Sequence, residues 1–278
     1  QLLDGADLVL GSSAGICAAG LARLGVRTAL VARVGDDVFG ATTLRMLADA
    51  GVDITAVRIV GDVPTGVSVI LSAPEDRSIL TLTGALSMLT SAEVRSAAAQ
   101  AAHVHFASYF LLPELAASLP DLLRELRDRG ITTSLDTNWD PAGDWQGVAE
   151  CLPLVDVLLP NAAEAVALAT AAGDQTADVE RAALALAVQG PLVVVKDGAD
   201  GGLAVAGDRV LRAPGLVVDV VDTTGAGDSF DAGFLAAWTN GAPLSRALRE
   251  AAVAGSLSTR GSGGTGGQAT RAEIDAHA

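Results

Sequence analysis

The chain has 278 residues, with 33 acidic and 18 basic side chains and a formal charge of −15 at pH 7, which argues against a general nucleic-acid surface or an anionic membrane partner. Half of the residues are hydrophobic, yet no apolar run approaches the roughly 20 residues of a membrane-spanning helix. No signal peptide is visible, and Cys17 and Cys151 both have apolar neighbours, so we expect buried thiols in a cytoplasmic protein.

Strand-like and helix-like segments alternate along most of the chain. In chain order we predict helix 14–24, strand 27–32, helices 39–50 and 91–101, strand 103–107, helix 113–129, strands 132–136 and 155–159, helices 161–171 and 179–188, strands 192–196 and 217–221, and helices 226–239 and 244–259. This alternation is typical of an α/β fold, in which helices cover both faces of a mostly parallel sheet.

Residues 65–82 interrupt this alternation and show no helical period. Val67, Val69 and Leu71 alternate with their neighbours, a turn-forming segment follows at 73–76, and an apolar run returns at 79–82. The pattern predicts a β-hairpin. Such a hairpin is either a lid over a site or an ordinary edge hairpin, and this segment alone does not separate the two.

The strongest candidate site is the segment Asp222-Thr223-Thr224-Gly225-Ala226-Gly227-Asp228, between a predicted strand and a predicted helix. Its glycines let the backbone approach a ligand, and the N–H groups at the start of the helix form an anion site. A carboxylate in that first turn would repel phosphate unless it accepts a proton from an attacking hydroxyl. The alternative is a purely structural turn capped by Asp228.

Two further predicted strands end in polar residues. Asn161 and Glu164 have the spacing of a capping box, which explains them without a ligand, but they could also face a hydrated Mg²⁺. Lys196, the only lysine of the chain, precedes Gly198 by two residues. It is either a solvated strand end or a cation near nucleotide phosphates.

Several other kinds of site are not supported. No P-loop occurs, and no dinucleotide fingerprint follows the first predicted strand. His103 and His105 share one face of a strand, where packing or capping is a better interpretation than metal binding. The glycine-rich run 261–267 follows a helix, so we give it no role in phosphate binding.

Residues 222–235 resemble the C-terminal signature of the ribokinase-like (PfkB) carbohydrate kinases. The segments 11–14 with 20–25, 34–40 and 161–164 are similar to further motifs of this family in the same order, so the resemblance extends over residues 11–270. It implies a single domain, 1–278, with a three-layer α/β/α fold and a small lid hairpin around 57–84. The N-terminal strand of the family is expected to be absent, because only about ten residues precede Gly11.

The resemblance also implies the activity, the cofactors and the site residues. It implies a kinase that transfers the γ-phosphoryl group of ATP to a sugar hydroxyl and uses Mg²⁺, with K⁺ as a further cation in many members. The implied base is Asp228, and the implied anion hole is Gly225, Ala226 and Gly227. The remaining implied residues are Asn161, Glu164, Lys196, Gly198, Thr223 and Gly255 for the nucleotide, Glu164 for Mg²⁺ through water, Asp222 and Thr224 for the monovalent cation, and Gly11, Ser12, Ser13, Ile16 and Asn138 for the substrate.

Two departures from the family pattern bear on the substrate. Ile16 replaces an asparagine that hydrogen-bonds sugar hydroxyls, and Asp140 stands where an arginine usually follows Asn138. We therefore expect a neutral sugar or polyol rather than a sugar acid, with Trp139 or Tyr109 as an apolar platform for its ring.

The alternatives are a nucleoside or inositol kinase, or a catalytically weak sugar- or nucleotide-binding protein. The intact Asp228 motif argues against the last of these, because a pure binding protein gains nothing from a carboxylate beside bound phosphate. A lid-mediated homodimer also fits the resemblance.

Overall fold

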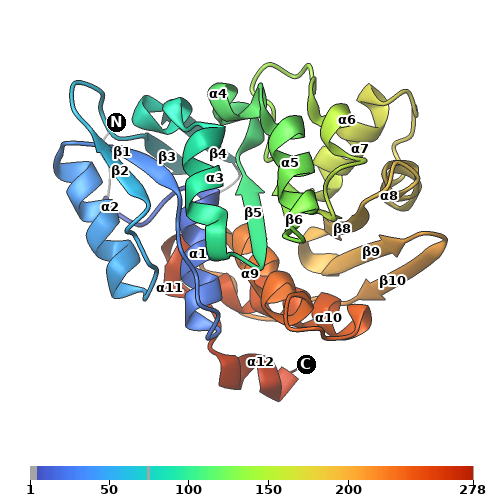
Figure 1. Ribbon diagram of the computed structural model, residues 1–278. Helices are drawn as coiled ribbons and strands as arrows, with labels where there is room; N and C mark the ends of the chain where they lie inside the picture. The colour runs from blue at the N-terminus through green and yellow to red at the C-terminus, as the bar shows by residue number, and fades with distance from the viewer. Residues whose placement is uncertain (1–4, 74–75, 278) are drawn as a thin grey trace.

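A six-stranded sheet in the order β10-β9-β8-β7-β6-β5 forms the centre of the molecule (Figure 1). The structure is a computed structural model and describes residues 5–73 and 76–277. Four neighbouring strands run parallel, namely β5 (His103–Ala107), β6 (Thr132–Asp136), β7 (Val157–Leu158) and β8 (Leu192–Lys196). An antiparallel hairpin of β9 (Gly202–Ala206) and β10 (Arg209–Ala213) extends the sheet beside β8. The predicted mostly parallel sheet is confirmed.

Helices cover both faces of this sheet (Figure 1). One layer contains α1 (Ser13–Arg23), α9 (Ala226–Trp238) and α10 (Leu244–Ser258), and the other contains α3 (Ser91–Ala97), α5 (Leu119–Asp128), α7 (Ala162–Ala171) and α8 (Val179–Ala187). Val193 and Val195 of β8 pack into the α5–α8 core, whereas Val194 packs toward α9 and α10. Burial on both faces explains why this strand is a continuous apolar run.

The shorter helical elements connect these layers. They are α4 (Pro113–Ala116), α6 (Val148–Cys151), α11 (Gly263–Gly266) and α12 (Arg271–His277), with 3-10 turns η1 (Gly84–Met88), η2 (Ala98–Gln100), η3 (Tyr109–Leu111) and η4 (Gly198–Asp200).

A smaller region follows α1. It contains the parallel pair β1 (Ala32–Gly35) and β2 (Val57–Val60), the connecting helix α2 (Val38–Asp49), and the antiparallel hairpin of β3 (Val67–Ala73) and β4 (Asp76–Leu82). The hairpin predicted from the sequence is thus confirmed, although Pro74 and Glu75 of its turn lie outside the described residues. Asp37 holds the start of this hairpin next to α2. Its carboxylate caps α2 by accepting from Gly40 N, and it also accepts from Thr65 N at 2.8 Å and Thr65 Oγ1 at 2.7 Å, just before β3.

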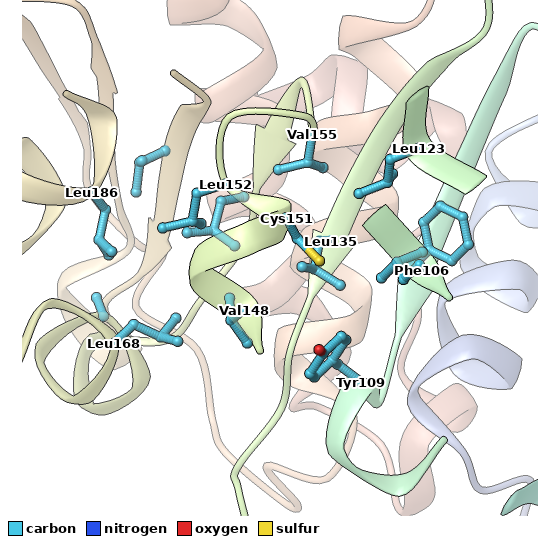
Figure 2. Close-up of a cluster of buried hydrophobic side chains, with 14 of the residues drawn as sticks. Phe106, Tyr109, Leu123, Leu135, Val148, Cys151, Leu152, Val155, Leu168 and Leu186 are labelled. Atoms are coloured by element: carbon cyan, nitrogen blue, oxygen red, sulfur yellow. The ribbon is translucent and has the colours of Figure 1, made fainter. Parts of the chain in front are cut away.

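The expectation of buried thiols is confirmed, since Cys17 and Cys151 are both buried and free. Cys151 lies among Leu135, Val148, Leu152 and Val155 (Figure 2). Burial raises the pKa of its thiol to about 12, so it behaves as an apolar core residue. Within 5–73 and 76–277, no helix is both long and apolar enough to cross a membrane.

The predicted strand at 217–221 is wrong. The segment has no regular secondary structure, and Val217 is fully exposed while Val220 and Val221 expose 62% and 65% of their surface. The N–H groups of Val221 and Asp222 donate to the carbonyl of Thr259, at the end of α10, rather than to a strand. Valines favour a strand only where a neighbouring strand supplies hydrogen bonds and packing.

Two other predicted elements also differ from the structure, and three strands were missed. The strand predicted at 27–32 lies later, at β1, and Ala29 forms only an isolated bridge to Asp53. The helix predicted at 113–129 is divided into α4 and α5, because Pro120 occupies the first turn of α5 and cannot continue a helix from its N-terminal side. The strands β2, β9 and β10 were not predicted.

The packing of α9 on the sheet generates a stability prediction. Phe234 is fully buried and stacks on Trp238 with ring centroids 6.4 Å apart. Phe234→Ala should lower the free energy of unfolding by about 3–5 kcal/mol, because it leaves a cavity between α9 and the sheet. Chemical denaturation measures the change. The matched control is Val188→Ala, which removes a side chain that is 86% exposed and should change stability by less than about 0.5 kcal/mol. Equal effects of the two substitutions would contradict this description of the core.

Candidate active site

Polar residues from four separate elements converge at the carboxyl ends of the parallel strands. Asp136 ends β6, Asn161 precedes α7, Lys196 ends β8, and Asp228 lies in the first turn of α9. Asn161 and Lys196 form a backbone bridge, and the Lys196 side chain reaches both Asp136 and the start of α9. This edge of the sheet is where open α/β folds bind ligands.

The loop before α9 has a tightly constrained shape. Gly225 is the N-terminal cap of α9 with a left-handed φ of 73°, and a Cβ there would lie 2.7 Å from Gly264 Cα and 3.0 Å from Ile16 Cγ2. Asp222 accepts from Thr224 N at 2.9 Å and from Gly263 N at 2.8 Å. The glycine-rich run 261–267, to which we gave no role in phosphate binding, therefore supports this loop through Gly263 and Gly264.

The first turn of α9 presents N–H groups that have no acceptor inside the helix, together with the positive end of its dipole. Asp228 lies in this turn. Burial, and after it the charge of Asp136, raises the pKa of Asp228 to about 6, while Lys196 and a hydrogen bond from the Ser13 side chain act in the opposite direction. A carboxylate with a pKa close to neutrality is suited to general-base catalysis.

Lys196 is not a solvated strand end, so that alternative is wrong. It is only 9% exposed, and its Nζ donates to Asp136 Oδ2 at 2.9 Å and to Asp231 Oδ2 at 3.1 Å. Burial alone would lower the pKa of Lys196, but Asp136 and Asp231 together raise it above its ordinary value. The sequence analysis gave no role to Asp136 or Asp231. A single lysine in an acidic chain was the one signal that pointed to such partners.

Asn161 and Glu164 form the predicted capping box of α7. Glu164 N donates to Asn161 Oδ1 and Asn161 N donates to Glu164 Oε2, both at 2.9 Å. Burial, and after it the charge of Asp136, raises the pKa of the Glu164 carboxyl to about 7. No cluster of three or more His, Cys, Asp or Glu able to hold a metal occurs in the described residues.

The predicted substrate residues fall into two groups. The Ser13 side chain is near enough to Asp228 to lower its pKa, and Asn138 lies beside the charged cluster, since its N–H donates to Asp136 Oδ1 at 3.1 Å. Gly11 and Ser12 lie on the surface next to α1. Ile16 is only 4% exposed and packs against Gly225 and Gly264, so it supports the loop rather than lining an open surface.

The predicted nucleotide residues are also spread over several environments. Thr223 and Gly198 are exposed, with Gly198 two residues beyond Lys196. Gly255 is buried in α10, where a Cβ would lie 3.2 Å from both Ala226 O and Phe230 Cβ. Its observed role is close packing of α10 beneath the start of α9, and contact with a nucleotide remains a prediction.

Most of the basic and aromatic residues that could contact a substrate are paired, buried or turned to solvent. Arg33 binds Glu93 through both Nε and Nη2 at 2.9 Å. Arg23 is exposed on α1, as expected. Tyr109 is 7% exposed, whereas Trp139 exposes 57% of its surface and rests edge-on against Trp145. Of the two predicted ring platforms, only Trp139 presents an open face.

The sequence model of the pfkB family carbohydrate kinases matches residues 14–271. The chain belongs to this family. An ATP-dependent ribose-1-phosphate kinase from Halopiger xanaduensis is 34% identical over 249 residues, which are 89% of this chain and 79% of the relative. A ribokinase from Haemophilus influenzae is 30% identical over 260 residues, 91% of this chain and 81% of the relative.

The solved structures agree with this membership. A crystal structure of fructokinase from Vibrio cholerae, in its fructose, ADP and calcium ion bound form, superposes with a TM-score of 0.84 and 26% identity, over 96% of this chain and 90% of that chain. The ribokinase-like fold and the ATP-dependent carbohydrate kinase activity expected from the sequence are confirmed.

The environment of Asp228 generates a pH prediction. Because burial raises its pKa to about 6, the carboxyl is protonated, and unable to accept a proton, at lower pH. We expect kcat/KM to fall about tenfold per pH unit below about pH 6. Initial rates measured across pH at subsaturating sugar test this, with the melting temperature recorded at each pH. An acid limb near pH 4, the ordinary range of a carboxyl group, would contradict the described burial.

Proposed function

We propose that this carbohydrate kinase phosphorylates a hydroxyl of a neutral sugar or polyol, with Asp228 as the general base. The observation that carries the proposal is the position of Asp228, in the first turn of α9 directly after the segment Gly225-Ala226-Gly227, with a raised pKa. A carboxylate beside an anion site serves a reaction in which a hydroxyl attacks a phosphoryl group.

Each residue of the site would have a distinct role in the phosphoryl transfer. Asp228 accepts the proton of the substrate hydroxyl while the oxygen of that hydroxyl attacks the γ-phosphorus of ATP in line. The bond between the γ-phosphorus and the β–γ bridging oxygen breaks, and ADP is released. The N–H groups of Gly225 and Gly227, together with that of Ala226, which here donates to Thr223 O at 3.2 Å, would stabilise the negative charge that develops on the transferred phosphoryl group. They are rigidly placed, because Asp222, Gly264 and Ile16 fix the loop.

Magnesium fits the same edge of the sheet. Glu164, whose carboxyl is buried beside Asp136 and Asp228, would hold the hydrated ion through water, with Asn161 next to it. When bound, Mg²⁺ neutralises charge on the phosphates of ATP. The fructokinase complex with ADP and a calcium ion supports a divalent ion in this role.

The other ligand contacts remain proposals from the family resemblance. Lys196, Gly198, Thr223 and Gly255 would contact the nucleotide, and Asp222 and Thr224 would hold a K⁺ ion. The Asp222 carboxylate already accepts hydrogen bonds from two backbone N–H groups. An ion bound there would contact a carboxylate that also stabilises the loop before α9.

The lid, the homodimer and the cytoplasmic location are also part of the proposal. Val69, Leu71, Leu80 and Leu82 share one face of the β3–β4 hairpin and are 46–62% exposed. An apolar face of this kind supports a hairpin that closes over substrate or packs against a second copy.

The preference for a neutral substrate rests on the charged residues Asp140 and Arg33, whose side chains already have partners within the protein. Asp140, in the place of the family's arginine, accepts the N–H groups of Ala142, Asp144 and Trp145 and so holds its own loop. Arg33 is paired with Glu93. A buried carboxylate or phosphate on the substrate needs a paired cation, and neither position supplies one.

Removal of the base tests the mechanism. Asp228→Ala should lower kcat by roughly 10² to 10⁴, because no other group accepts the hydroxyl proton, while ATP affinity survives. Steady-state rates and calorimetric ATP binding measure the two effects. Asp208→Asn, which neutralises an exposed carboxylate in the β9–β10 turn, is the control and should leave both unchanged. A folded Asp228→Ala protein with near-normal kcat would refute the role of Asp228.

A substrate panel tests the substrate class. Ribose, fructose, inositol, adenosine, 2-keto-3-deoxygluconate and ribose 1-phosphate compete at equal concentration, and we expect a neutral sugar or polyol to have the highest kcat/KM. The sugar phosphate is included because the Halopiger relative is named for it. If an anionic substrate leads by about tenfold or more, the inference from Asp140 and Arg33 is wrong.

A further inference from the structure

The centre of the site contains more buried charge than the mechanism above uses. Asp136 and Asp231 are 1% and 0% exposed, and both contact the ammonium of Lys196. The three residues come from β6, α9 and β8, so they join the sheet to the helix that carries Asp228. We call them the lysine triad. Buried ion clusters are seldom retained for stability alone, because burying each charge is costly.

Hydrogen bonds satisfy the two carboxyl groups of the lysine triad to different degrees. Asp136 Oδ1 accepts from Asn138 N and Asp136 Oδ2 accepts from Lys196, so both oxygens of this carboxylate are satisfied. Asp231 Oδ2 accepts from Lys196, whereas Asp231 Oδ1 is buried and finds no donor among the described residues. Two carboxyl groups that share one buried ammonium repel each other unless one of them is protonated.

The pKa shifts of the two carboxyl groups have opposite directions. Burial raises the pKa of Asp231 well above its ordinary value. Burial would also raise the pKa of Asp136, but Lys196 holds it below its ordinary value. These directions favour a lysine triad of one ammonium, one carboxylate and one carboxylic acid, which would carry no net charge. This balance allows it to lie in the interior.

The ammonium is held directly against the start of α9. A Cβ built on Gly227 would lie 3.4 Å from Lys196 Cδ and 3.9 Å from Lys196 Nζ. A lysine ammonium has three N–H donors, and two of them are used by Asp136 and Asp231. One N–H therefore remains beside the turn that would bind the γ-phosphoryl group.

We propose that Asp136 and Asp231 are positioning residues, which hold Lys196 against Gly227 so that its remaining N–H donates to the γ-phosphoryl group of ATP. The inference rests on the proposed function of this site, and it gives a role to two residues to which the family resemblance assigned none. A lysine side chain has four rotatable bonds, and a second anchor keeps its ammonium in place before the phosphate arrives. A donor fixed in advance stabilises developing charge without reorganisation.

The decisive variant removes the whole lysine triad at once. Lys196→Met alone would leave Asp136 buried without its ammonium, whereas Lys196→Met/Asp136→Asn/Asp231→Asn replaces all three groups by neutral ones of similar size, a change that buried ion clusters often tolerate. We expect a cooperatively folded protein with kcat reduced about 10- to 100-fold and an unchanged KM for the sugar. Asp208→Asn serves again as the control.

Nucleotide binding gives a second readout that needs no sugar. Calorimetry compares ADP with a nonhydrolysable ATP analogue in the presence of Mg²⁺. We expect the wild type to favour the analogue, and the triple variant to lose about tenfold or more of that preference while ADP affinity is retained. A purely structural role of the lysine triad would change both affinities together or neither.

A rescue pair keeps the inference testable if the triple variant does not fold. Asp231→Ala should lower kcat about tenfold or more by releasing the ammonium, and Asp231→Asn should recover most of that loss, because its amide oxygen can still accept from Lys196 Nζ. Wild-type kcat in Asp231→Ala, or in a folded triple variant, would overturn the inference. So would an unchanged preference for the ATP analogue.

These outcomes are distinct from a failure of the proposed function. If the wild type consumes no ATP with any sugar, the proposed function fails, and the nucleotide comparison still decides whether Lys196 senses a γ-phosphate. If the wild type is active and the triple variant is equally active, only the inference about the lysine triad fails.

Discussion

The buried contact between Lys196 and the carboxyl groups of Asp136 and Asp231 is the interaction on which the rest of the site depends. It ties the ends of β6 and β8 to α9 at 2.9 and 3.1 Å, in a region with little solvent to screen charge. Asp228 and Glu164 lie within the field of the same cluster, and their raised pKa values reflect burial first and the charge of Asp136 second. A single lysine is thus the local cation for four carboxyl groups, which leaves the site prepared for the cations that accompany ATP.

The loops around this cluster are fixed by packing and backbone hydrogen bonds. Asp222 connects the loop before α9 to Gly263, and Gly225 fits only because it has no side chain next to Gly264 and Ile16. On the other side, Asn138 links the end of β6 to Ser108 after β5, accepting from Ser108 N at 2.8 Å. Rigid loops on a buried sheet let the donors face a reacting phosphate without first rearranging.

Local patterns in the sequence were sufficient to predict the parallel strands β5 to β8, most helices and the start of α9 after Gly225, because each depends on residues close together in the chain. The partners of Lys196 could not be predicted in this way, since they lie 60 and 35 residues away and only the fold brings them together. The strand predicted at 217–221 failed for the opposite reason. Its valines match the composition of a strand, but no neighbouring strand pairs with them among the described residues.

The central claim is that Asp228 and the α9 N-terminus transfer a phosphoryl group to a sugar hydroxyl. Phosphorus NMR of the protein with ATP, Mg²⁺ and the preferred sugar follows this transfer directly. The account predicts that the γ-phosphorus signal is replaced by a sugar phosphomonoester in equal amount to the ADP formed, and that Asp228→Asn stops this conversion. Formation of inorganic phosphate at the same rate with and without sugar would contradict it.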